Sequence, residues 1–125
     1  MVGPQTIRSL LLFSFFALTA CSGGGADAQL SPQQDLGRRL FSQRCASCHV
    51  TSGDTVIVGP SLAGIASEAG GRIPGLEARA YIQQSILQPS AYLNPGYNDL
   101  MPQTFGQILP TDDLNALISY LLTLE

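Results

Sequence analysis

Long connections rich in glycine and proline constrain the fold of this chain more than any other feature. Residues 50–75 and 88–110 carry most of the glycines and prolines, and each exceeds the loop length usual in compact domains. No segment alternates convincingly like a set of strands. Helical spacing of apolar residues occurs at 31–45, 76–87 and 111–122. We therefore expect an all-α fold with about three main helices, which lacks an obvious core of its own unless another group fills the middle.

Local signals mark where these helices begin and end. Ser31 is suited to be an N-cap, and Gln34 is placed to complete a capping box. Thr111 is the expected N-cap of the last helix, and Pro89 ends the middle one. Gly37 disfavours a helix by about 1 kcal/mol relative to alanine. Its small size would allow a second helix to approach closely.

The segment Cys45-Ala46-Ser47-Cys48-His49 is a C-x-x-C-H sequence, the attachment signature for c-type haem. Two thiols at this spacing reach the two vinyl groups on one side of a porphyrin and form thioethers. The following residue then lies beneath the iron as its proximal ligand. The sequence therefore predicts one covalently bound haem c, attached through Cys45 and Cys48, with His49 on the iron.

Two other chemistries use paired cysteines. A thiol–disulfide redox pair usually opens a helix of a thioredoxin-like βαβ fold, and the sequence predicts no such strands. A zinc site needs four ligands, usually cysteine or histidine. His49 is the only histidine, and Cys21 is the only further cysteine. Haem attachment is the interpretation that we favour.

Met101 is the candidate for the second axial ligand by elimination. The chain has no second histidine, and Met1 is the only other methionine. Met101 precedes Pro102 in a loop, whereas a methionine that only fills the core is expected among apolar helix residues. Ligation by His49 and Met101 favours electron transfer and leaves no open site for a small-molecule substrate.

The charge of the chain disfavours nucleic acid as a partner. Six basic residues, all arginine, stand against nine acidic ones, which gives a net charge of −3. Nucleic-acid binding needs a basic face that neutralises phosphates.

The N-terminus resembles the signal of a bacterial lipoprotein. Residues 10–20 form an apolar run that is shorter than a membrane-spanning helix and is typical of a secretory signal. The segment that ends at Cys21 is similar to a lipobox, which implies cleavage before Cys21 and a lipid on this residue. An ordinary signal or an uncleaved anchor is the alternative. We expect a signal peptide at 1–20, a flexible lipidated tether at 21–30 and a haem-binding domain at 31–125.

The chain resembles the class I c-type cytochromes from residue 35 to its end. The resemblance is carried by Gly37, Phe41, the C-x-x-C-H segment, Gly59-Pro60-Ser61-Leu62-Ala63-Gly64-Ile65, Met101-Pro102 and Tyr120. It implies the cytochrome c fold, a crossing of the first and last helices at Gly37 and Tyr120, and a hydrogen bond from His49 to the Pro60 carbonyl. The implied pocket walls, which equally suit a general core, are Leu62, Ile65, Leu87, Leu93 and Phe105.

The resemblance further implies an electron carrier rather than an enzyme. The expected location is the outer face of the cytoplasmic membrane, and the expected partners are a quinol-oxidising complex and a haem–copper oxidase. The alternative to a free carrier is a fixed subunit of one such complex, for example alternative complex III. Mitochondrial members dock through a ring of lysines, but this chain has none. We expect apolar and backbone contacts around residues 45–49 instead. The alternatives are a haem enzyme or gas sensor with an open distal site, and a lipoprotein whose haem is only structural.

Overall fold

The computed structural model describes residues 29–125, and these residues contain helices but no strands. The order is α1 (Pro32–Arg44), α2 (Ile65–Arg72), α3 (Ala78–Leu87), the 3₁₀ helix η1 (Pro89–Ala91), α4 (Phe105–Ile108) and α5 (Thr111–Leu121). The expected all-α class is confirmed. No helix within this range has the length and apolarity needed to cross a bilayer. The predictions for the signal peptide, for Cys21 and for most of the tether concern residues outside the described range.

The three helices expected from periodicity correspond to α1, α3 and α5. At the start of α1, the Ser31 hydroxyl accepts a hydrogen bond from the Gln34 N–H at 3.2 Å, and the Gln34 side chain accepts one from the Ser31 N–H at 2.8 Å. The predicted capping box is therefore present. The expectation that Thr111 caps α5 is wrong. Pro110 is the N-cap, and its carbonyl accepts from the Leu114 N–H at 3.0 Å, so Thr111 lies inside the helix.

The helices α2, η1 and α4 lie within the long connections and were not expected. Gly70 and Gly71 lower the intrinsic helix propensity of α2 by about 1 kcal/mol each. Packing against α3 stabilises α2 nonetheless. The chain enters α2 through Gly64, whose φ of +76° is a left-handed conformation that glycine adopts without strain.

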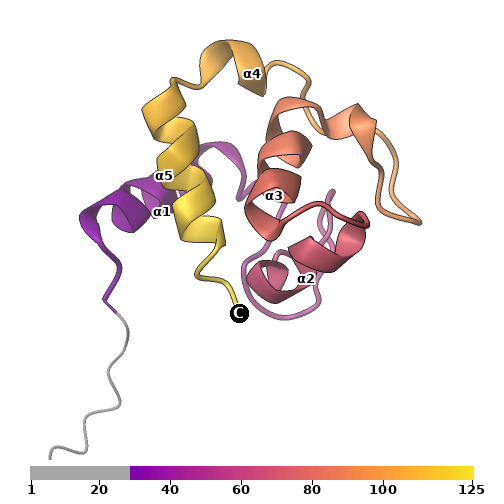
Figure 1. Cartoon of the computed structure of the whole chain (residues 1–125), viewed down its shortest axis with the longest axis horizontal. Helices are drawn as coiled ribbons and strands as arrows, with labels where there is room; N and C mark the ends of the chain where they lie inside the picture. The colour runs from indigo at the N-terminus through magenta and orange to yellow at the C-terminus, as the bar shows by residue number, and fades with distance from the viewer. Residues whose placement is uncertain (1–28) are drawn as a thin grey trace, which may run out of the picture.

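The crossing of α1 and α5 is the most extensive helix contact in the described structure (Figure 1). A Cβ added at Gly37 would lie 2.0 Å from the carbonyl oxygen of Ala116 and 2.7 Å from the Cβ of Tyr120. Only glycine therefore permits this separation of the two helices. One turn further along α1, the rings of Phe41 and Tyr120 meet with centroids 5.8 Å apart and tilted by 56°. The crossing implied by the resemblance is present.

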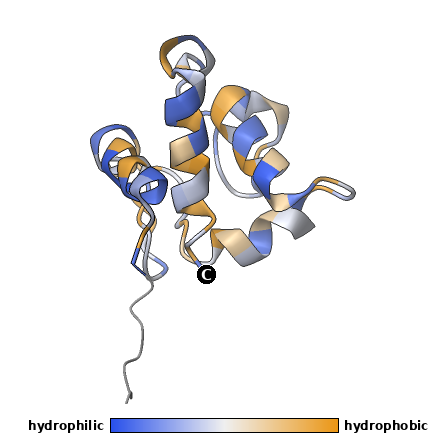
Figure 2. Ribbon diagram, turned by 60° about the vertical axis from the view of Figure 1, so that its left-hand side comes forward, coloured by the Kyte–Doolittle hydropathy of each residue, from blue (hydrophilic) through white to orange (hydrophobic). Residues whose placement is uncertain are grey.

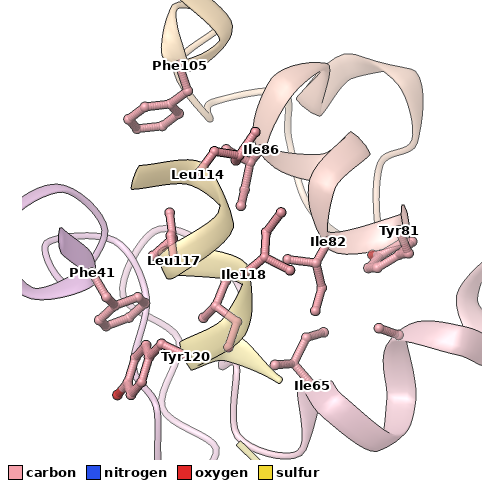
Figure 3. Close-up of a cluster of buried hydrophobic side chains, with 12 residues drawn as sticks. Phe41, Ile65, Tyr81, Ile82, Ile86, Phe105, Leu114, Leu117, Ile118 and Tyr120 are labelled. Carbon is pink, nitrogen blue, oxygen red and sulfur yellow. The ribbon is translucent and has the colours of Figure 1, made fainter. Parts of the chain in front are cut away.

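Side chains from five helices form one apolar core (Figure 3). The longer helices each carry apolar and polar stretches, as expected for helices packed around one core (Figure 2). Ile118 is fully buried at its centre, and α2 and α4 add Ile65 and Phe105. The core is thus larger than the three expected helices would provide. Its members are Phe41, Ile65, Ala69, Tyr81, Ile82, Ile86, Phe105, Leu114, Leu117, Ile118, Tyr120 and Leu121.

Candidate functional site

A cavity lies beside the core, and the C-x-x-C-H segment forms part of its wall. Cys45 is the C-cap of α1, where its N–H donates to the Phe41 carbonyl at 2.8 Å. The next turn is tight because the N–H groups of Cys48 and His49 both donate to the Cys45 carbonyl, at 2.9 and 3.0 Å. This turn brings both thiols and the imidazole to the same cavity.

The imidazole of His49 is oriented by a main-chain carbonyl. Its Nδ1 lies 2.8 Å from the Pro60 oxygen. A carbonyl only accepts hydrogen bonds, so Nδ1 carries the proton and donates it. The Nε2 atom then keeps its lone pair and is the ring nitrogen available to a metal. The Pro60 carbonyl occupies the position that the family resemblance implies.

The loop that supplies Pro60 is tied to the C-x-x-C-H turn. The Gly59 N–H donates to the Cys48 carbonyl at 3.0 Å, and the Leu62 N–H donates to the Val50 carbonyl at 2.8 Å. A Cβ at position 59 would lie 2.3 Å from the Cε1 atom of His49. The imidazole therefore fits against the loop only because residue 59 is glycine.

Met101 reaches the same cavity from the connection between η1 and α4. Its side chain is partly buried and also packs against the core. The neighbouring Leu100 is well exposed. Met101 is thus placed both to line the cavity and to contact the core.

Apolar side chains form most of the remaining cavity wall. Four of the five implied wall residues, Leu62, Ile65, Leu93 and Phe105, line the cavity. Leu87 does not line it, because Leu87 packs at the edge of the core near Gly106 of α4. Four wall residues from α3 and the segment after it were not predicted, although the spacing of α3 indicates a buried face: Tyr81, Ile82, Ile86 and Tyr92.

A polar cluster also lies at the cavity. Arg72 pairs with Glu68 one turn earlier in α2 and donates to the Asn94 side chain at 3.4 Å. The Tyr81 hydroxyl donates to the same Asn94 oxygen at 3.4 Å. The spacing of Glu68 and Arg72 is a helical signal, but the two glycines between them obscured it.

The environment of Cys45 does not activate its thiol. Burial raises the pKa of Cys45 to about 11, against a smaller lowering effect of Arg44. Reactive redox cysteines instead have lowered pKa values, often at a helix N-terminus, whereas Cys45 ends a helix. Within residues 29–125, no three His, Cys, Asp or Glu side chains gather as a zinc site requires. Both alternatives to haem attachment therefore lack support in the described residues.

The donor set around the cavity fits a haem of the c type. It offers two thiols for thioether bonds, an imidazole with Nε2 available, a methionine thioether and apolar walls. Among residues 29–125, no other group of side chains combines these features.

Comparisons with known proteins agree with this chemistry. The cytochrome c family model matches residues 34–125, which is most of the chain. "Cytochrome c type-1" of Ascaris suum is 28% identical over 99 residues, and the match covers 70% of this chain and 84% of that protein. Proteins of the matched family bind covalently attached haem c, and Cys45 and Cys48 have the spacing of its attachment motif.

Proposed function

The chain belongs to the cytochrome c family, and from this premise we propose that it is a single-haem class I electron carrier ligated by His49 and Met101. Family members are generally electron carriers, and the cofactor is covalent haem c. When bound, this haem supplies a one-electron couple between the ferrous and ferric states of its iron. The protein holds the group and shields it from water.

Each proposed site residue has a separate task. Cys45 and Cys48 would form the thioether bonds to the haem. His49 ligates the iron through Nε2, because Pro60 holds the proton on Nδ1. Met101 would supply its thioether as the other ligand of the iron. A ligand of this kind favours a relatively high reduction potential and occupies the position at which a substrate or gas would bind.

One observation carries this proposal. Four donors from separate parts of the chain line one cavity: Cys45, Cys48 and His49 follow α1, whereas Met101 comes from the connection before α4. The same cavity has apolar walls, which lower the local dielectric and favour the buried cofactor. An exposed thiol pair with a distant methionine would not support a shielded electron-transfer site.

Replacement of Met101 by alanine tests the axial assignment. We expect the holoprotein to keep covalent haem, to lose the long-wavelength methionine–iron charge-transfer band of its ferric form, and to have a lower reduction potential. Ile108→Ala is a matched control, since Ile108 is exposed and does not line the cavity.

An unchanged spectrum and potential in Met101→Ala would reject Met101 as a ligand. The alternative function, a haem enzyme or gas sensor with an open distal site, predicts that the wild-type ferrous protein already binds carbon monoxide readily. The electron-carrier proposal predicts such binding only after Met101 is removed.

We further propose that the protein is exported and held at the outer face of the cytoplasmic membrane. The apolar run at 10–20 and the lipobox-like sequence at Cys21 support a cleaved signal of residues 1–20, a lipid on Cys21 and a tether of residues 21–30 before the cytochrome domain of residues 31–125. Cytochrome c domains are usually extracytoplasmic, which agrees with export. The variant Cys21→Ser should keep its haem spectrum but leave the membrane fraction. Continued fractionation with membranes would locate the anchor elsewhere.

The proposed partners are respiratory membrane complexes, namely a quinol-oxidising complex, a haem–copper oxidase or both; as a fixed subunit, the chain would belong to a quinol-oxidising complex such as alternative complex III. The apolar residues Val56, Ile57 and Val58 are exposed, and Gly59 directly after them hydrogen-bonds to Cys48. An apolar contact near the haem attachment site suits the weak, rapid encounters of electron carriers. It also suits a chain without lysine.

A pair of matched variants tests this docking mode. Ile57 is 51% exposed and Ile108 is 48% exposed, so serine at either position costs little burial. We expect Ile57→Ser to slow the reduction of the holoprotein by quinol-supplied membranes, and Ile108→Ser to leave the rate unchanged. Equal rates for both variants would place the docking contact elsewhere.

A further inference from the structure

The connection that carries Met101 has few main-chain hydrogen bonds of its own. The Tyr97 N–H donates to the Asn94 carbonyl at 3.1 Å, and the Leu100 N–H donates to the Asn98 carbonyl at 2.9 Å. Between the described residues, no main-chain N–H donates to the Met101 carbonyl. Side chains must therefore provide much of what holds this segment in place.

Three polar side chains form a hydrogen-bonded chain that reaches the backbone of Met101 through Gln103. Asp99 accepts from the Ser90 hydroxyl at 2.6 Å through Oδ2 and from Gln103 Nε2 at 3.2 Å through Oδ1. The same Gln103 Nε2 donates to the Met101 carbonyl at 3.2 Å. An amide nitrogen has two hydrogens, so one Gln103 side chain satisfies both acceptors.

Ser90 connects this group to the rigid part of the fold. It lies in η1, which directly follows α3 and packs against it. The preceding Pro89 is buried, and α3 contributes Ile82 and Ile86 to the core. The Ser90–Asp99 hydrogen bond therefore joins the Met101 segment to a fixed element.

We propose that Ser90, Asp99 and Gln103 form a clamp that holds Met101 at the cavity, where its thioether would ligate the haem iron. This inference rests on the proposed ligation by Met101. The clamp lowers the population of conformations in which the Met101 segment moves away from the cavity. An external ligand binds only to such open conformations, so its apparent affinity increases with their population. Asp99 is the central positioning residue because it bridges the other two side chains.

The binding of imidazole to the ferric holoprotein measures this population. Asp99→Ala removes both hydrogen bonds of the carboxylate. We expect it to bind imidazole about three- to tenfold more tightly than wild type and to weaken the methionine–iron charge-transfer band. Gln103→Ala should change both measurements in the same direction, and it provides a second test if Asp99→Ala does not fold.

Two variants separate hydrogen bonding from charge. Asp99→Asn keeps an acceptor for Gln103 and places an amide donor opposite the Ser90 hydroxyl, so its imidazole affinity should stay within about twofold of wild type. Asp54→Ala removes the same charge from an exposed residue that has no hydrogen bond or ion pair to the described residues. It should leave the affinity and the spectrum unchanged.

The outcomes distinguish the clamp from the ligand assignment. If Asp99→Ala and Gln103→Ala match Asp54→Ala while Met101→Ala binds imidazole far more tightly, the clamp is wrong and the proposed function stands. If Asp99→Asn behaves like Asp99→Ala, the hydrogen-bond basis of the clamp is wrong. If Met101→Ala itself does not change imidazole binding or the spectrum, the proposed ligation fails and the clamp fails with it.

Discussion

Replacement of Gly37 by alanine tests how closely α1 and α5 must approach. Two effects of this substitution oppose each other. Alanine favours a helix over glycine by about 1 kcal/mol. The new methyl group, however, would lie 2.0 Å from the Ala116 carbonyl oxygen and 2.6 Å from its carbon. These atoms belong to the backbone of α5, so no side-chain rotation relieves the overlap.

The steric effect should exceed the gain in helix propensity. Overpacking of a well-packed core costs about 1–3 kcal/mol, occasionally more. Here the helices must separate by about 1 Å or more to reach normal contact distances, and that movement loosens the contact between Phe41 and Tyr120. Because the overlap is with backbone atoms, we take the upper end of this range, about 3 kcal/mol, as the steric cost. After the propensity gain of about 1 kcal/mol is subtracted, we expect Gly37→Ala to lower the free energy of unfolding by about 2 kcal/mol.

Gly71→Ala is the matched control, because it makes the same chemical change in α2 with nothing within 4 Å of the added Cβ. It should raise the free energy of unfolding by about 0.4–1 kcal/mol. The measurement is urea unfolding of both variant holoproteins and of wild type. Their unfolding free energies are compared provided that the denaturant dependence of the free energy (the m-value) is the same. A Gly37→Ala protein that is as stable as wild type, or more stable, would refute the close helix crossing.

Three further variants probe the site, the core and the surface. Gly59→Ala should displace the ring of His49, because the new Cβ would lie 2.3 Å from Cε1. The yield of holoprotein should therefore fall, and its unfolding free energy should decrease by about 1–3 kcal/mol. Ile118→Ala should lower the unfolding free energy by about 2–5 kcal/mol, since Ile118 is fully buried. Asp35→Asn should destabilise the protein at neutral pH but not in acid. A hydrogen bond from Arg38 lowers the pKa of Asp35 below 3.8, so its stabilising effect is present above pH 3.8 and is lost as the pH falls through the lower folded-state pKa.

Each of these variants has an outcome that would contradict its reasoning. Normal haem incorporation and stability in Gly59→Ala would show that the loop adapts to a methyl group. If Ile118→Ala lowers the unfolding free energy by less than about 1 kcal/mol, the neighbouring core side chains must move to fill the cavity that the substitution leaves. A stability difference between wild type and Asp35→Asn that persists unchanged in acid would exclude the carboxylate as its source.

The sequence by itself determined the cofactor chemistry and the main helices. The C-x-x-C-H segment specifies its own geometry, because all its groups lie within a single turn of chain. The capping box at Ser31 and the apolar stripe of α5 are equally local signals. Gly37 also indicated a close helix contact. A glycine inside a helical pattern lowers helix propensity, and no turn or helix end nearby explains its presence.

The tertiary structure decided which loop residues meet at the cavity. α2 forms although Gly70 and Gly71 disfavour it, since packing against α3 outweighs propensity. Leu87 lies outside the cavity wall because it packs near Gly106 of α4. The hydrogen bond between Ser90 and Asp99 depends on how the connection after η1 turns back. Such contacts join residues from different segments of the chain. Because no regular spacing in the sequence relates these residues, only the folded chain reveals the contacts.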